Sequence, residues 1–153
     1  MMLAAAFAAG GCGGGSGKAA AVSPPPSGGP LSQAQLVAKA DAICARVDTE
    51  ISDVKPVAPG PAEIAVVAPR SAALQRSAVA ELSRLTPPPA VAPAWQRLIA
   101  YRRTLAEGLA KLASYAKQGD PRGVQAAGAA LRLPRTLLAS VRRAGLQRCL
   151  VSG

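Results

Sequence analysis

Two aspartates, Asp41 and Asp48, are the side chains whose spacing could support acid–base chemistry. They stand seven residues apart, which places them on one face of a helix, where paired carboxylates could exchange protons. The same spacing is typical of a solvated helix face, which is the interpretation we favour. The chain has no histidine, so it lacks the base of Ser-His-Asp or Cys-His catalysis and any imidazole metal ligand. We therefore expect a protein that is not an enzyme and that uses no metal or cofactor.

The three cysteines are the second group of residues that could do chemistry. Cys12 stands alone in a glycine-rich stretch, whereas Cys44 and Cys149 form an even pair that suits an oxidising compartment. The chain has no C-x-x-C spacing, which disfavours redox catalysis by these residues. A structural disulfide is the interpretation we favour, with two buried free thiols or a redox pair as the alternatives.

The basic residues are unevenly distributed along the chain, whose formal net charge is +10. Residues 1–100 hold eight basic and six acidic groups, a net +2, whereas residues 101–153 hold ten and two, a net +8. Such an excess favours anionic surfaces through long-range attraction, although a solvated face is the competing interpretation. Nucleic acid is a weaker alternative, because Trp95, Tyr101 and Tyr115 are too few aromatic residues for a stacking platform.

The elements that position these residues begin with a helix after Ser32. Ser32 and Gln35 form an S-x-x-Q capping box, and Leu31 and Leu36 can pack as a hydrophobic staple. Apolar residues then recur at helical spacing. They are Leu36, Ala40, Ile43, Val47, Ile51 and Val54. Prolines after residue 55 end this helix.

Three further helices follow. The second carries an apolar phase from Ile64 to Leu85 that continues across Pro69, which predicts one kinked helix. The third runs from Trp95 towards Gly119, and the pair Asp120-Pro121 then starts a fourth as a cap and a first-turn proline. We expect Pro134 to kink this fourth helix and Gly145 to end it.

These patterns predict an all-α fold, an antiparallel four-helix bundle over residues 31–153, because each apolar stripe can be buried only against the others. No run of alternating β-branched and polar residues indicates a strand. The first and last helices of such a bundle are antiparallel neighbours, and a return of the tail after Gly145 could bring Cys149 to Cys44. Closing a loop of about 100 residues removes roughly 4–5 kcal/mol of unfolded-state entropy.

The N-terminal stretch resembles the end of a bacterial lipoprotein signal peptide. Met1 to Ala9 forms the apolar segment, and Ala9-Gly10-Gly11-Cys12 forms the small-residue box. The resemblance implies a signal peptide over residues 1–11, lipidation of Cys12 with acyl chains such as palmitate, and a lipid anchor in the membrane. No basic residue precedes the apolar segment, so we expect the signal to start upstream. A disordered Ala/Gly tail is the other interpretation.

Residues 12–30 are rich in glycine, serine and proline and carry a single charge. They cannot bury enough apolar surface to fold, which predicts a disordered N-terminal tether. A largely flexible chain of this length spans roughly 20–25 Å on average. The tether would hold the bundle just clear of a membrane.

Four short motifs occur together in the bundle region. They are KADAIC at residues 39–44, RLTPPP at 84–89, GD at 119–120 and AGLQRC at 144–149. The set resembles small secreted or lipid-anchored helical proteins of high-GC Gram-positive bacteria, a group without an assigned function. The resemblance covers roughly residues 31–150 and implies a four-helix domain closed by its two cysteines. It supplies no active-site residues.

The expected function is that of a non-catalytic cell-envelope lipoprotein, an interaction or structural module on the extracytoplasmic face of the membrane, or a secreted form of it. We expect contact with anionic lipid, wall polymer or an envelope protein, and not with nucleic acid. The residues for anionic contact are Arg132, Arg135, Arg142 and Arg143. The alternative is an extracytoplasmic small-ligand carrier with a cavity near Trp95, between helices kinked at Pro69 and Pro134.

Overall fold

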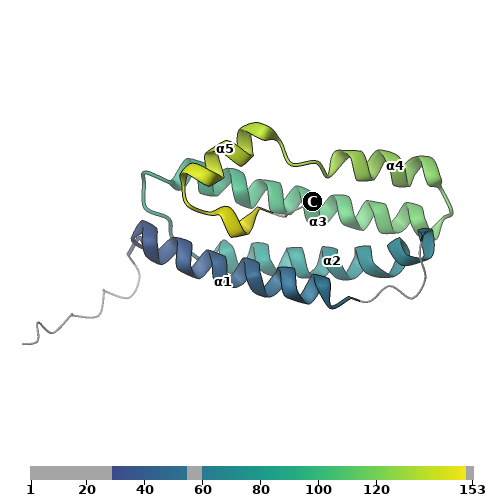
Figure 1. The fold of residues 1–153 in the computed structure, drawn as a ribbon, viewed down its shortest axis with the longest axis horizontal. Helices are drawn as coiled ribbons and strands as arrows, with labels where there is room; N and C mark the ends of the chain where they lie inside the picture. The colour runs from purple at the N-terminus through teal and green to yellow at the C-terminus, as the bar shows by residue number, and fades with distance from the viewer. Residues whose placement is uncertain (1–28, 55–59, 151–153) are drawn as a thin grey trace, which may run out of the picture.

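The computed structural model describes residues 29–54 and 60–150, and every regular element in these ranges is helical (Figure 1). The elements are α1 (Gln33–Ser52), α2 (Pro61–Leu82), α3 (Ala92–Lys117), α4 (Pro121–Ala130), α5 (Arg135–Arg143) and the short 3-10 turn η1 (Gln147–Cys149). Helices α1, α2 and α3 alternate in direction, and α4 and α5 return together along α3 (Figure 1). The predicted all-α bundle is therefore confirmed, with its fourth arm made of two helices.

The start of α1 forms as its sequence predicts. The Oγ of Ser32 accepts a hydrogen bond from the Gln35 amide at 3.2 Å, and the Gln35 side chain accepts one from the Ser32 amide at 2.9 Å. The Leu31 amide donates to the Thr86 carbonyl at 2.9 Å, which ties the start of α1 to the connection between α2 and α3. Leu36 is fully buried, and Leu31 packs against the same core.

Helix α2 continues through Pro69, as predicted, but its buried stripe differs from the predicted one. Val67 and Leu74 are only half-buried, whereas Ala68, Ala72 and Gln75 are buried. Ser71, Ala78 and Leu82 of the predicted stripe are buried as well, so the buried side of α2 keeps part of the predicted phase and extends one residue further around the helix. This extension includes a polar side chain, Gln75, which lies inside the bundle.

The fourth arm departs from the prediction at Pro134. We expected one kinked helix, but α4 ends at Ala130 and Pro134 is the N-cap of a separate helix, α5. Proline lacks the amide hydrogen that a continuous helix needs, and it disfavours helical geometry at Leu133, the residue before it. The start of α4 was predicted correctly, since Asp120 accepts a hydrogen bond from the Gly123 amide at 3.0 Å.

Two glycines end helices in the left-handed conformation. Gly119 follows α3 with φ +67°, and Gly145 follows α5 with φ +81°. After α5, the Leu146 amide donates to the Val141 carbonyl at 3.1 Å and the Gly145 amide to the Arg142 carbonyl at 3.0 Å. This pair of bonds is a Schellman motif, which reverses the chain after the helix. The reversal directs η1 back towards α1.

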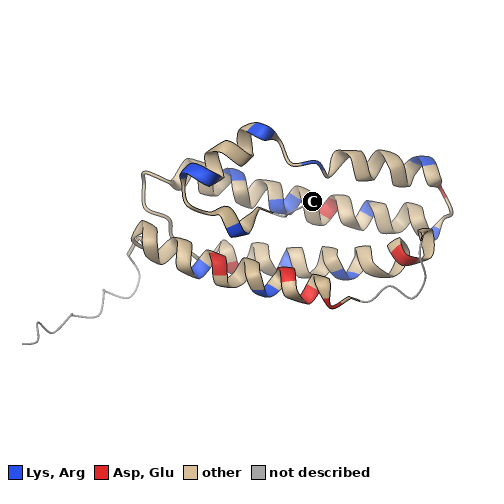
Figure 2. Ribbon diagram, viewed as in Figure 1, with Lys and Arg blue, Asp and Glu red and all other residues tan. Residues whose placement is uncertain are grey.

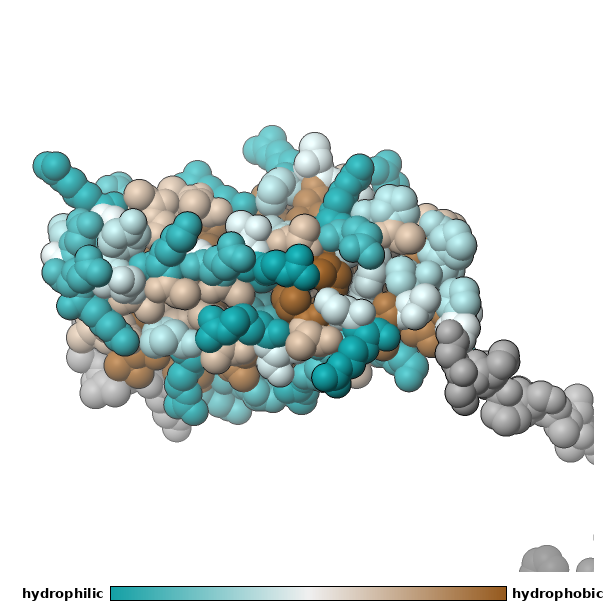
Figure 3. Space-filling model, turned by 180° about the vertical axis from the view of Figure 1, so that it is seen from behind, coloured by the Kyte–Doolittle hydropathy of each residue, from teal (hydrophilic) through white to brown (hydrophobic). Residues whose placement is uncertain are grey.

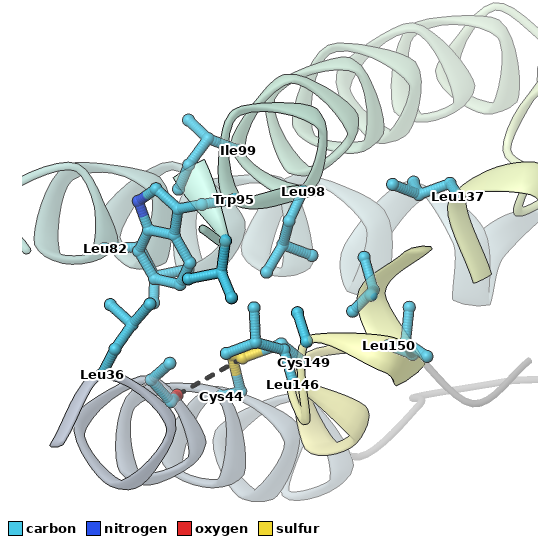
Figure 4. Packing of buried hydrophobic residues seen from close by; sticks show 14 residues of the cluster. Leu36, Cys44, Leu82, Trp95, Leu98, Ile99, Leu137, Leu146, Cys149 and Leu150 are labelled. Carbon is cyan, nitrogen blue, oxygen red and sulfur yellow. Dashed lines mark hydrogen bonds between the residues drawn. A yellow bond between two sulfur atoms is a disulfide. The ribbon is translucent and has the colours of Figure 1, made fainter. Parts of the chain in front are cut away.

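The hydrophobic core is concentrated where α1, α3, α5 and η1 meet (Figure 4). The indole of Trp95 is 1% exposed and lies beside Leu36 and Leu82 (Figure 4). Leu146 and η1 close the core on the side opposite the indole. In contrast, α4 has no buried residue, so this helix is held mainly by its cap and its contact with α3.

Candidate functional site

The Cys44–Cys149 disulfide links α1 to η1, as the sequence predicts. The two Cα atoms are 5.1 Å apart, both side chains are fully buried, and the Sγ of Cys149 lies 3.4 Å from the Ala40 carbonyl oxygen (Figure 4). The turn at Gly145 makes this pairing possible, because it brings the residues after α5 onto α1. The pair is structural in this environment, since no solvent reaches either sulfur.

A fully buried arginine, Arg102, lies directly beside the disulfide and was missed from the sequence. Its Nη1 donates to the Gln75 side-chain oxygen at 2.8 Å, and its Nη2 donates to the Cys149 carbonyl at 2.7 Å. Burial lowers the pKa of the guanidinium, and the nearby Asp48 opposes this shift. Arg102, on α3, is therefore hydrogen-bonded to both α2 and the C-terminal turn η1. Its side chain is fully buried, so a ligand in solution does not reach it.

The position of Arg102 was visible in the sequence. It follows Leu98 by four residues and precedes Leu105 by three, so it occupies the same helical phase as the apolar residues of α3. A charged residue at such a position is buried only when hydrogen-bond partners accompany it. Those partners come from α2 and η1, and a sequence pattern does not identify them.

The two aspartates that could have supported acid–base chemistry are not on a solvated face, and that interpretation was wrong. Asp41 and Asp48 flank the buried stripe of α1 and are half-buried. Partial burial raises the pKa of both carboxyls, opposed by Arg148 at Asp41 and by Arg102 at Asp48. One oxygen of Asp41 is buried and has no hydrogen-bond partner among the described residues.

These aspartates do not form a recognisable catalytic or metal centre. Asp48 lines a shallow depression of about 310 Å³ with Gln147, Arg148 and Leu150, and Asp41 is not part of its lining. Within residues 29–54 and 60–150, no three His, Cys, Asp or Glu side chains gather closely enough to hold a metal ion. Both aspartates instead lie half-buried on α1, near the residues of η1.

The arginine surface, which we define as Arg132, Arg135, Arg142 and Arg143, follows α5 and the connection before it. All four side chains are exposed, and none forms an ion pair with a carboxylate in the described part of the chain. The carboxylates are concentrated on α1, whereas basic residues mark α5 and its approach (Figure 2). The Arg46 ion pairs with Glu50 and Glu81 lie on α1 and α2.

The arginine surface ends beside the start of the bundle. The Gln33 side chain, on the first residue of α1, donates to the Ala144 carbonyl at 3.3 Å. Ala144 is the C-cap of α5 and directly follows Arg142 and Arg143, so the end of α5 that carries these two arginines lies beside the start of α1. Figure 1 shows the ends of the two helices at the same end of the bundle. This contact relates the basic surface to the predicted tether.

An apolar groove of about 560 Å³ lies between α3 and the α4–α5 connection. Leu105, Leu131 and Leu137 line its apolar part, and Arg97 and Arg132 are the charged residues of its lining. Trp95, near which we expected a cavity, is packed into the core and lines neither this groove nor the smaller hollows found among the described residues. The groove instead forms where Pro134 separates α4 from α5.

The connection that borders the groove is held in place by α3. The Tyr101 hydroxyl donates to the Leu131 carbonyl at 3.4 Å, and burial raises the pKa of this hydroxyl, which keeps it protonated. Gly108 permits close packing at the same point, because a Cβ there would clash with the side chain of Leu131. The groove is therefore bordered by a fixed connection.

No family model, curated protein or solved structure matches this chain. In the described ranges, no helix is both long enough and apolar enough to cross a membrane. Residues 1–28, which include Cys12, the signal-like segment and most of the predicted tether, lie outside the described residues. Among the described residues, the arginine surface and the groove are the features on which we base a functional proposal.

Proposed function

We propose that this chain is a non-catalytic lipoprotein of the cell envelope, whose arginine surface contacts anionic material at the extracytoplasmic face of the membrane. The observation that carries the proposal is the position of Arg142 and Arg143, exposed and without ion pairs in the described structure, beside the start of α1. A signal-like segment over residues 1–11 and a lipid on Cys12 would tether that same end. The resemblance to small lipid-anchored proteins of high-GC Gram-positive bacteria supports this location.

The energetics suit a weak contact that depends on the tether. Attraction of a basic side chain to an anionic membrane contributes about 1 kcal/mol for each residue close to the surface, so four arginines contribute about 4 kcal/mol. This attraction acts only within roughly 8 Å at physiological ionic strength. The arginine surface would orient a tethered bundle against the surface without anchoring it alone.

Sedimentation with anionic vesicles tests this proposal. We expect the chain with Cys12→Ser to sediment with phosphatidylglycerol vesicles at low salt and to be released by salt. Charge reversal of the four arginines to glutamate should abolish sedimentation.

A matched control carries the same charge reversal on exposed arginines outside the arginine surface. These are Arg70, Arg76, Arg84 and Arg103. The control should retain most of the binding. Equal loss in both variants would show that net charge alone drives the contact, and absence of binding by the unmutated chain to vesicles and wall polymer alike would remove the proposal.

A small-ligand carrier is the second candidate function. The groove between α3 and the α4–α5 connection favours it, because its volume of about 560 Å³ is in the range of small-molecule sites. Saturable binding of an apolar ligand by the purified chain separates a carrier from a module that only contacts surfaces.

A further inference from the structure

We propose that the groove between α3 and the α4–α5 connection binds a single-chain anionic amphiphile, a long-chain fatty acid, with its acyl chain along the leucines and its carboxylate at Arg97 or Arg132. This inference rests on the second candidate function, the ligand carrier, and it names the class of ligand. It does not depend on lipidation of Cys12 or on binding of the chain to vesicles.

The apolar part of the groove suits an acyl chain. Leu105 and Leu137 are buried residues whose side chains line the groove, and Leu131, Ala100 and Pro134 extend the apolar lining. Apolar lining with a few placed polar groups is characteristic of small-molecule sites. An acyl chain in this groove would be removed from water along its length, which favours binding in proportion to the area buried.

The charged part of the groove determines the sign of the headgroup. Arg97 on α3 and Arg132 on the connection both line the groove, and no acidic residue does. Both arginines are exposed and have no carboxylate partner within the described ranges. A guanidinium pairs with a carboxylate through two parallel hydrogen bonds, so a carboxylate headgroup fits this rim better than a neutral or cationic one.

The face of the molecule seen from behind carries no broad apolar surface among its described residues (Figure 3). Figure 3 shows hydrophobic areas of limited size among long hydrophilic side chains on that face. A large continuous apolar surface would favour a protein partner, because such surfaces mark protein interfaces. The apolar groove of about 560 Å³, with its two arginines, favours a small amphiphile instead.

Calorimetric titration of the full-length Cys12→Ser chain with monomeric myristate tests the inference. We expect saturable one-to-one binding and weaker binding of myristyl alcohol, which has the same chain and a neutral headgroup. The double variant Arg97→Gln, Arg132→Gln should weaken myristate binding by about tenfold or more, because a charge-assisted pair is lost, and should leave binding of the alcohol unchanged. The variant Ala100→Phe should fill the groove and abolish binding of both.

The matched control is Arg142→Gln, Arg143→Gln, which removes the same charge from arginines outside the groove lining. It should retain myristate binding while it reduces sedimentation with anionic vesicles, so the two proposals fail independently. Melting temperatures of all variants identify any that do not fold. The inference is overturned if the alcohol binds as tightly as myristate, if the control weakens myristate binding as much as the groove variant, or if lysophosphatidylglycerol binds and myristate does not.

Discussion

Replacement of Arg102 by methionine should destabilise the bundle strongly, although no ligand or surface contacts this residue. The side chain is fully buried, and its two donated hydrogen bonds end on the Gln75 side chain and the Cys149 carbonyl, at 2.8 and 2.7 Å. Methionine retains much of the volume but leaves both acceptors buried and unpaired. Each such acceptor costs about 1–3 kcal/mol, so two of them predict a loss of about 2–6 kcal/mol in the free energy of unfolding.

A second substitution separates the hydrogen bonds from the packing. In the double variant Arg102→Met, Gln75→Leu, one of the two unpaired acceptors is removed together with its partner. The double variant should therefore be more stable than Arg102→Met alone, by about 1–2 kcal/mol. The neighbouring Arg103 is exposed, and Arg103→Met should change stability by about 0.5 kcal/mol or less.

Urea unfolding of the oxidised chain, followed by circular dichroism at neutral pH, measures these free energies. The Cys12→Ser background prevents thiol exchange with the disulfide. A loss below about 1 kcal/mol for Arg102→Met would refute the assignment of Arg102 as the polar contact between α2, α3 and η1. If the double variant is no more stable than Arg102→Met alone, the hydrogen bond between Arg102 and the Gln75 oxygen does not contribute to stability.

Three further outcomes are expected. The double variant Cys44→Ser, Cys149→Ser should have a lower melting temperature in a thermal scan. The disulfide closes a loop with a sequence separation of 105 residues and contributes up to about 5 kcal/mol to stability by restricting the unfolded chain. An unchanged melting temperature would contradict this. Asp41→Asn should stabilise the chain at neutral pH, because the raised folded pKa makes the native charge unfavourable. This gain should shrink as pH falls through the raised pKa towards the ordinary value of 3.8, and a gain that stays constant over this pH range would contradict the reasoning. Mass spectrometry of the native protein should find diacylglycerol on Cys12, and an unmodified N-terminus in the cytosolic fraction would end the lipoprotein proposal.

Local signals in the sequence predicted the ends of the helices well. The capping box at Ser32, the Asp120 cap and the glycines after α3 and α5 each depend on a few neighbouring residues, so the pattern contains the information that fixes them. The disulfide was also predicted, from the even pair of cysteines and from a bundle topology in which a return of the tail after Gly145 could bring Cys149 to Cys44.

The interior and the groove were harder to predict because they depend on packing between distant segments. Arg102 is buried through partners on α2 and η1. Asp41 is half-buried on α1, which packs against η1, and Arg148 of η1 is near enough to act on its charge. Proline at position 134 is compatible with either a kink or a break in a helix. Helix α4 is short and has few apolar residues, so the sequence pattern did not indicate that it ends before Pro134. The groove forms where the chain breaks between α4 and α5, whereas we had expected a cavity near Trp95.

The disulfide also determines how the molecule responds to a protease. Helices α2, α3, α4 and α5 all lie between Cys44 and Cys149, within a covalent ring. A single cut in any connection of this ring, such as residues 131–134, leaves both new ends attached to one molecule. Release of a fragment from the ring requires a second cut or reduction of the disulfide. A nicked molecule would therefore migrate as the intact chain in a denaturing gel without reductant and as two pieces with it.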